Sequence, residues 1–306
     1  MNLNLKKYPA KVLLFGEYSI IKGNSALAFP LNEYSGNWAF DNDVNNKNLK
    51  NWASYINKIQ QANNADFQID IERFNNDLSK GLFFNSNIPM GYGVGSSGAL
   101  CAALYDEYSV ENNRLTPKND TIFTLKRIFQ DLENFFHGSS SGIDPLICYL
   151  NQPLLLKGKT EANLIKLKKP TNNNGAVFLL NTQQPRQTEP LVQFFLKQLK
   201  HKEFETAFEN EWCVYNEKII TAFINQNHGE LFDNLRLLSE FQFNHLPPMI
   251  PKGFEKFWAS SLKHNEFTIK LCGAGGGGFL LGFTQNWNNT EESLSKDFEI
   301  IKIIDL

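Results

Sequence analysis

The chain has 306 residues, 42% of them hydrophobic and 20% charged, so it can bury a sizeable core and is far from the disordered class. Its 30 basic and 32 acidic residues leave a net charge of −2, which argues against a broad nucleic-acid-binding face. No apolar run approaches the roughly 18 residues that a membrane span needs, and residues 1–9 lack the apolar core of a signal peptide. Four scattered cysteines without CxxC spacing complete the prediction of a cytoplasmic protein with buried free thiols.

The first part of the chain opens with short apolar runs separated by glycine and asparagine, which predict an antiparallel meander of strands. An alanine-rich run at 98–108 predicts a helix buried against a sheet. Residues 120–136 predict a long amphipathic helix with Asp120 as its N-cap. The other elements predicted here are strands at 11–15, 18–21, 26–31 and 67–71 and a helix at 49–63.

A change of composition at 166–175 predicts a linker, so we divide the chain into domains 1–170 and 171–306. Strands and helices alternate without the regular period of a doubly wound parallel sheet, which favours a two-domain α+β protein. Beyond the linker we predict strands at 176–180, on both sides of 273–278 and at 299–306, and helices at 191–200, 203–226, 229–241 and 253–263.

Three glycine-marked segments carry the candidate chemistry. The first lies directly before the alanine-rich helix, where glycines let the backbone approach a ligand and the helix N-terminus favours an anion. By itself such a loop predicts a phosphate site no better than a plain connection. It is not an ATP-binding P-loop, because no lysine precedes its two serines. Its residues are Gly91, Gly93, Gly95, Ser96, Ser97 and Gly98.

The second segment, residues 273–278, formally fits the spaced glycines of a dinucleotide-binding loop. An apolar β-like run follows it at 279–283, whereas the dinucleotide motif requires a helix there. The local interpretation is therefore a strand–glycine–strand turn.

The third segment places Glu133 and His137 four residues apart at the end of the long helix, and Asp144 follows a Ser/Gly loop. Each residue has a structural alternative: Glu133 as a surface acid, His137 as a charge at a helix C-terminus, and Asp144 as an N-cap before Pro145.

Taken together, the stretches KVLLFGEYSIIKG, PMGYGVGSSGAL, HGSSSGID and KLCGAGGGGF resemble the signature motifs of the GHMP kinases, and they span positions 10 to 283. Within this superfamily the chain is most similar to mevalonate kinases, because of the Glu133-to-Asp144 spacing and the segment Asn181–Val192. The resemblance implies an N-terminal domain like domain 2 of ribosomal protein S5, a ferredoxin-like C-terminal domain, and ATP-dependent phosphorylation of the primary alcohol of mevalonate to 5-phosphomevalonate.

The resemblance also implies roles for individual residues. Asp144 would be the catalytic base or orienting group, with Lys11 beside it, and the backbone of residues 91–98 would cradle the phosphates of ATP. Ser97 and Glu133 would bind Mg²⁺, which takes one or two protein oxygens together with phosphates. The substrate side would be formed by Glu17, Tyr18, His137, Gly275 and Gly276.

Tyr18 stands where mevalonate kinases usually have a histidine that contacts the substrate, which leaves the acceptor open. The alternatives are another GHMP substrate, above all phosphomevalonate, a GHMP-type decarboxylase, or a non-catalytic member that binds a nucleotide or metabolite. A phosphorylated acceptor would need extra cations, for which Lys22 and Arg186 are candidates. The resemblance implies no nucleic-acid or membrane partner and allows a homodimer.

Overall fold

The computed structural model describes residues 6–62, 67–111, 114–118, 120–158, 161–167, 174–186 and 188–306. Residues 1–5 of the N-terminal segment and residues 168–173 of the predicted linker lie outside these ranges, as does the predicted domain boundary at residue 170. In the part that is described, no helix is both long and apolar enough to cross a membrane.

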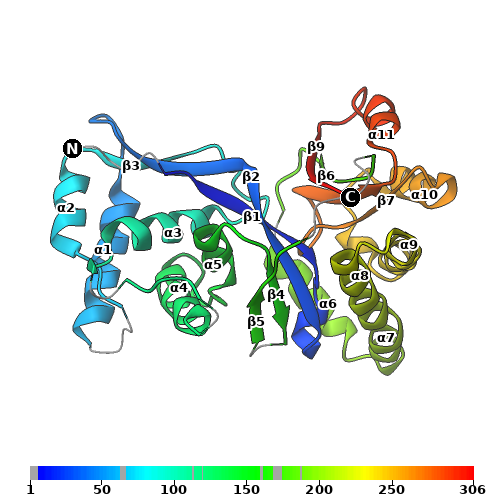
Figure 1. Ribbon diagram of the computed structural model, residues 1–306, viewed down its shortest axis with the longest axis horizontal. Coiled ribbons are helices and arrows are strands. Elements are labelled where there is room, and N and C mark those ends of the chain that lie inside the picture. The colour runs from blue at the N-terminus through cyan, green and yellow to red at the C-terminus, as the bar shows by residue number, and fades with distance from the viewer. Residues whose placement is uncertain are drawn as a thin grey trace.

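The N-terminal half is built on an antiparallel sheet whose strands run in the order β1-β2-β4-β5, with β3 pairing the far end of β2. Helices α3 and α5 pack against β1, and α4 packs against both of them (Figure 1). The strands are β1 (Tyr8–Phe15), β2 (Ser25–Phe40), β3 (Leu82–Ser86), β4 (Leu154–Lys157) and β5 (Glu161–Leu164). The helices are α1 (Lys47–Gln61), α2 (Ile71–Ser79), α3 (Ser96–Tyr108), α4 (Ile122–His137) and α5 (Ile143–Leu150).

The C-terminal half has a four-stranded antiparallel sheet in the order β7-β8-β6-β9. Its chain order of one strand, helices, two strands, a helix and a last strand is that of the ferredoxin-like fold. The strands are β6 (Ala176–Asn181), β7 (Phe267–Leu271), β8 (Phe279–Thr284) and β9 (Ile300–Asp305). The helices are α6 (Thr188–Gln198), α7 (Lys202–Ala207), α8 (Cys213–Asn225), α9 (His228–His245), α10 (Glu255–His264) and α11 (Trp287–Leu294), with a π-helical turn at Phe208–Trp212 between α7 and α8.

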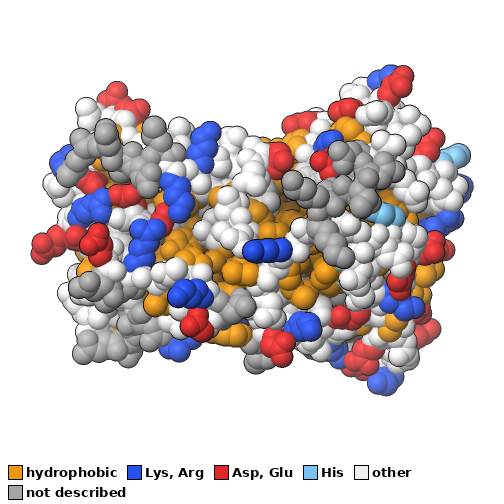
Figure 2. Space-filling model, viewed as in Figure 1, with side chains coloured by type: hydrophobic (Ala, Val, Ile, Leu, Met, Phe, Trp, Pro, Cys, Tyr) orange, Lys and Arg blue, Asp and Glu red, His pale blue; other side chains and the backbone are white. Residues whose placement is uncertain are grey.

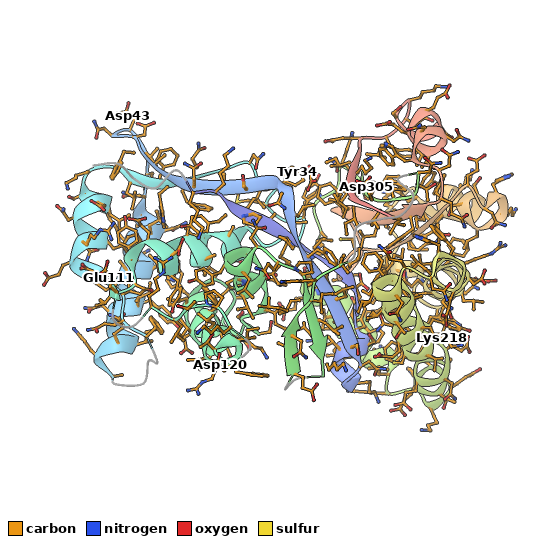
Figure 3. The ribbon with its side chains drawn as sticks, viewed as in Figure 1. Tyr34, Asp43, Glu111, Asp120, Lys218 and Asp305 are labelled. Carbon is orange, nitrogen blue, oxygen red and sulfur yellow. The ribbon has the colours of Figure 1, made fainter. Side chains whose placement is uncertain are left out.

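The two halves share an apolar junction along the ribbon formed by β1 and β2. Phe15, at the end of β1, contacts the rings of Phe223 on α8 and Phe283 on β8. Tyr34, labelled in Figure 3 on β2, lies against Phe279 at the start of β8. Figure 2 shows that apolar side chains reach the surface along the middle of this face, where the halves meet. The α+β, two-domain architecture predicted from the sequence is therefore confirmed.

Three local predictions are wrong. Residues 18–21 are not a strand, because Gly16 and Gly23 turn the backbone sharply and a 3-10 turn forms at Ser19–Lys22. Residues 67–71 make a single β-bridge at Ile69 before α2 begins at Ile71. Asp120 does not cap α4, whose N-cap is Thr121.

Candidate active site

The loop between β3 and α3 turns at three glycines. Gly91, Gly93 and Gly95 have φ angles of 78°, 70° and 82°, which glycine adopts without the strain that a Cβ would cause. Gly95 is the N-cap of α3, and no side chain caps this helix. The N–H groups of its first turn therefore lack intrahelical partners and, with the helix dipole, favour an anion.

Gly98 allows the start of α5 to approach the start of α3. A Cβ at Gly98 would lie 2.9 Å from the carbonyl carbon of Asp144 and 3.0 Å from the nitrogen of Pro145. Because no side chain separates the two helices here, Asp144 comes next to the glycine loop. Asp144 lies in the first turn of α5, whose N-cap is Gly142, so its predicted alternative as an N-cap is wrong.

Lys11 joins the β1 strand to this loop. Its backbone N–H donates to the carbonyl of Val94, and its aliphatic chain packs against Gly95. Its ammonium lies 2.8 Å from the carboxylate of Asp144, with the lysine side chain 10% and the aspartate side chain 37% exposed. An ion pair that is buried on one side and open on the other leaves a carboxylate oxygen available to a ligand in the cleft.

Glu133, near the end of α4, is almost completely buried. Its carboxylate accepts hydrogen bonds from the hydroxyls of Ser97, at 2.9 Å, and Ser140. Burial and the nearby charge of Asp144 raise the pKa of Glu133 to about 7, against the opposing effect of the two serines and Lys11. Negative charge at this position is thus incompletely compensated by the protein.

His137 closes the group on the side of α4. Its Nε2 atom lies 2.9 Å from the hydroxyl oxygen of Ser97, which also donates to Glu133. The structure therefore places His137 beside the predicted phosphate loop. Its predicted contact with the acceptor remains a prediction.

The Glu133 carboxylate and the Ser97 hydroxyl fit a magnesium ion that completes its shell with phosphate and water. Among the described residues, no group of three or more His, Cys, Asp or Glu side chains could enclose a metal ion. Within the described part of the chain, no basic side chain forms an ion pair with Glu133, since Lys11 pairs with Asp144 and lowers the pKa of Glu133 only through its charge. A carboxylate and a serine hydroxyl are the kind of partial oxygen shell that Mg²⁺ uses alongside a nucleotide.

Arg186, a candidate cation within the segment Asn181–Val192, forms part of the opposite wall. Its guanidinium donates to the carbonyl of Cys272 at 2.8 Å and lies over Gly93 and Gly273, where any Cβ would collide with it. Its backbone N–H donates to the carbonyl of Gly91. The segment before α6 is thus bound to both glycine-rich segments.

These walls enclose a cleft of about 990 Å³. A cavity of this size suits a nucleotide with a small second substrate. Residues that sequence reasoning did not assign to the site also line it, among them Phe84, Leu100, Phe136, Thr188, Glu189 and Val192. The described cleft-lining residues include Gly91, Gly93, Gly95, Ser96, Ser97, His137, Asp144 and Arg186.

Four predicted substrate residues, Glu17, Tyr18, Gly275 and Gly276, are not among the described residues that line this cleft. They lie behind Arg186, where the 273–278 turn meets the N-terminal half. Gly276 faces Leu191 at the base of α6. Their roles as substrate contacts stay predictions.

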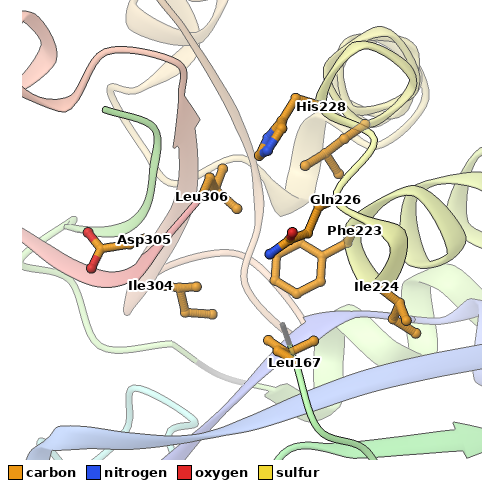
Figure 4. Close-up of a pocket in the computed structure, with 9 residues that line it drawn as sticks. Leu167, Phe223, Ile224, Gln226, His228, Ile304, Asp305 and Leu306 are labelled. Atoms are coloured by element: carbon orange, nitrogen blue, oxygen red, sulfur yellow. The ribbon is translucent and has the colours of Figure 1, made fainter. Parts of the chain in front are cut away.

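A second, much smaller pocket of about 30 Å³ lies between α8, α9 and the C-terminal strand (Figure 4). It has room for about one water molecule. Its walls, including Phe223, Ile224, Ile304 and Leu306, are mainly apolar. It offers no chemistry comparable to that of the large cleft.

Comparison with known proteins agrees with these features. Residues 51–152 match the family model of the GHMP kinases N terminal domain. Mevalonate kinases of Thermococcus gammatolerans and Thermococcus onnurineus are each 26% identical to the chain, over 47% of its length and 48% of theirs. The chain thus matches about half the length of these curated relatives.

Solved structures resemble the whole fold. The mevalonate kinase of Methanococcus jannaschii superposes with a TM-score of 0.63 at 18% identity, covering 98% of both chains. The phosphomevalonate kinase of Streptococcus pneumoniae gives a TM-score of 0.65 at 14% identity, covering 97% of this chain and 99% of that one. These likenesses show the fold, and with the family match they confirm the resemblance to GHMP kinases that the motifs indicate.

Proposed function

We propose that this chain, with its GHMP kinase motifs and fold, is an ATP-dependent kinase that phosphorylates the primary alcohol of mevalonate. The observation that carries the proposal is the Lys11–Asp144 ion pair beside the glycine loop, whose aspartate lines the cleft. A carboxylate and an ammonium next to an anion-binding loop are what transfer of a phosphoryl group to an alcohol requires.

The reacting alcohol would lie against Asp144. As its oxygen bonds to the γ-phosphorus and the bond to the bridging oxygen of ATP breaks, Asp144 accepts the hydroxyl proton or holds the oxygen in line. Lys11, paired with this carboxylate, would stabilise negative charge that develops on the alcohol oxygen. Most of the rate enhancement would come from positioning and charge stabilisation.

The nucleotide would bind along the 91–98 loop, with its phosphates against the first turn of α3. Ser97 and Glu133 would hold Mg²⁺, which when bound supplies positive charge to the phosphates. His137, already bonded to the Ser97 hydroxyl, would orient that hydroxyl.

Arg186 favours an acceptor that carries a carboxylate, as mevalonate does. Among the described residues lining the cleft it is the one arginine, and none is a lysine. Lys22, the other candidate cation, pairs with Glu205 and Glu209 instead, at 2.7 Å and 3.0 Å. A single guanidinium suits one carboxylate better than the additional charge of phosphomevalonate.

Further parts of the proposal concern the chain as a whole. We place the boundary between the two domains near residue 170, because the two described sheets lie on either side of it in sequence. The four cysteines are free and buried, which supports a cytoplasmic protein.

A coupled assay of ADP release tests the proposal. Purified chain with Mg·ATP is offered mevalonate, phosphomevalonate, homoserine and galactose in parallel. We expect turnover with mevalonate to exceed that with the others by at least about tenfold. More ADP release with phosphomevalonate than with mevalonate would show that phosphomevalonate is the acceptor. No ADP release above background with any of the alcohols would refute the kinase proposal and favour a non-catalytic binder.

Asp144→Asn is the matched variant, because it keeps the size of the side chain and removes its charge. We expect turnover to fall by about 10²- to 10⁴-fold, the usual contribution of an acid–base group. Wild-type turnover in this variant would show that Asp144 is not catalytic.

A further inference from the structure

Three consecutive residues of the 272–274 segment are each held by a different side chain. The carbonyl of Cys272 accepts from Arg186 at 2.8 Å, and the carbonyl of Ala274 accepts from the Tyr18 hydroxyl at 2.9 Å. Between them, the N–H of Gly273 hydrogen-bonds to the carboxylate of Glu17. Two adjacent residues of the N-terminal half therefore hold the same short segment that holds Arg186.

Lys270 strengthens this connection. It is completely buried on β7, and its ammonium contacts the Glu17 carboxylate, the Leu14 carbonyl at 3.1 Å and the Leu271 carbonyl at 2.8 Å. An ammonium has three N–H donors, so these three acceptors satisfy it completely. A buried charge pair of this kind is costly to break by removing one partner, because the other charge would remain unpaired.

Tyr18 is held in a conformation that needs support from its surroundings. Its φ angle is 60°, which is unusual for an aromatic residue. Its ring stacks on Phe195, with centroids 4.2 Å apart, and meets Trp212 edge-on. Burial raises the pKa of its hydroxyl, so the group is protonated and donates at ordinary pH. Strained residues that are fixed by packing often position a functional group.

The guanidinium of Arg186 depends on this segment for its direction. Its Nε atom is buried without a partner among the described residues, while Nη1 is fixed by the Cys272 carbonyl. The guanidinium lies between Gly93 and Gly273, which have no side chains that could hydrogen-bond to it. A shift of the 272–274 backbone would therefore redirect the guanidinium.

We propose that Glu17, Tyr18 and Lys270 are positioning residues, which act through the backbone of residues 272–274 to aim Arg186 at the carboxylate of the acceptor. This inference rests on the proposed function for the identity of the acceptor. It changes the expected role of Glu17 and Tyr18 from touching the substrate to orienting the cation that does.

The first test measures the accessibility of the Arg186 side chain directly and does not depend on enzyme activity. Phenylglyoxal modifies accessible arginines, and peptide mass spectrometry gives the rate at Arg186 relative to the exposed Arg236. In Tyr18→Phe, which keeps the ring and removes the bond to Ala274, we expect this relative rate to rise about three- to tenfold. Tyr55→Phe is the control, because it removes a hydroxyl-to-carbonyl bond to Asp131 between two residues that are not among the described residues lining the cleft. Glu17→Gln with Lys270→Met removes both buried charges together and should raise the rate likewise.

The second test is a double-mutant cycle. We expect Tyr18→Phe to raise the KM for mevalonate about three- to tenfold, with the KM for ATP within about twofold of wild type. In an Arg186→Lys background the same change should alter the KM for mevalonate by less than about twofold, because the group being positioned is gone.

Failures of the two proposals are distinguishable. If Tyr18→Phe leaves Arg186 modified at the wild-type rate, or if its effect on KM is equal in both backgrounds, the positioning proposal is wrong while the kinase can still be active. If the wild-type chain does not phosphorylate mevalonate, the proposed function fails, and the modification rates alone decide whether the positioning network exists.

Discussion

Residues 91–98 and residues 273–278 are both dominated by glycine, yet the structure needs glycine in the two segments for different reasons. In the first, Gly93 and Gly95 make room for the side chains of Arg186 and Lys11. In the second, Gly275 and Gly277 make room for backbone carbonyls, those of Met249 and Gln184. Gly273, at the edge of the second segment, also faces Arg186, and Gly98 of the first meets the backbone of α5. The interior of the second segment is nevertheless packed against backbone, so glycine content alone does not identify a ligand loop.

The elements that flank the two glycine-rich segments explain the difference between them. The first segment leads into α3 and offers a free helix N-terminus, whereas the second joins β7 to β8, which pair antiparallel. The two also touch, since a Cβ at Gly278 would lie 3.0 Å from the carbonyl oxygen of Tyr92. The packed turn therefore supports the open loop, and substitutions should affect stability in the turn and chemistry in the loop.

The largest expected effect is on chemistry beside the open loop. Lys11→Met keeps the aliphatic chain against Gly95 but removes the charge next to Asp144, so turnover should fall by about 10²- to 10⁴-fold. Steady-state kinetics measures this, with thermal unfolding as a check on the fold. Lys302→Met is the control, because it removes the exposed ion pair with Asp305. A Lys11→Met enzyme within threefold of wild type would remove Lys11 from the mechanism.

The next effect compares the two segments directly. Gly275→Ala would place a Cβ 2.7 Å from the Met249 carbonyl at a φ of 77°, and should lower the free energy of unfolding by about 2–4 kcal/mol. Gly91→Ala has a similar φ of 78°, but its Cβ would meet Pro185 at an ordinary 3.5 Å, so about 1 kcal/mol is expected. Denaturant unfolding measures both. Equal losses would contradict the distinction between a packed turn and an open loop.

A smaller effect concerns pH. The pKa of Glu133 is raised from 4.5 to about 7 in the folded chain, so the folded state binds more protons than the unfolded state between these values. Its contribution to stability is therefore lost as the pH rises through that window. Without nucleotide or Mg²⁺, the stability of Glu133→Gln relative to wild type should increase by about 1–3 kcal/mol from pH 5 to pH 8. Urea unfolding at several pH values measures it, and a flat difference would show that Glu133 is not desolvated.

The smallest effect is on nucleotide use. Ser97→Ala removes the hydroxyl that bonds to Glu133 and His137. The KM for Mg·ATP should rise about tenfold, as expected for one lost bond to a charged group, while the KM for mevalonate stays within about twofold. Initial rates with each substrate varied in turn give both values. The reverse pattern would place Ser97 on the acceptor side.

Patterns that repeat along the chain predicted much of the fold. The amphipathic stripe of α4 and the alanine-rich face of α3 are local signals of burial, and both helices occur near the predicted bounds. The interpretation of 273–278 as a turn between strands is also confirmed, because a β-like run after glycines is itself local.

What the sequence could not predict depends on contacts between distant residues. A lysine in the apolar run of β7 gives no sign that it is fully buried, because its partner Glu17 lies 253 residues away. Arg186 reaches the cleft through its bond to the Cys272 carbonyl, which no spacing encodes. Residues 18–21 read as a strand by composition, but φ angles at Gly16 and Gly23 decided otherwise.

The Glu17–Lys270 pair also limits how the molecule can move. Glu17 belongs to the N-terminal half and Lys270 to the C-terminal sheet, and both are buried where the halves meet. Hinge opening at this junction would break the contact between Glu17 and Lys270, so the buried pair opposes separation of the halves. We therefore expect substrates to enter without rotation of the halves, through local displacement of the cleft rim around Met90, which is 83% exposed, and Glu189 at the start of α6.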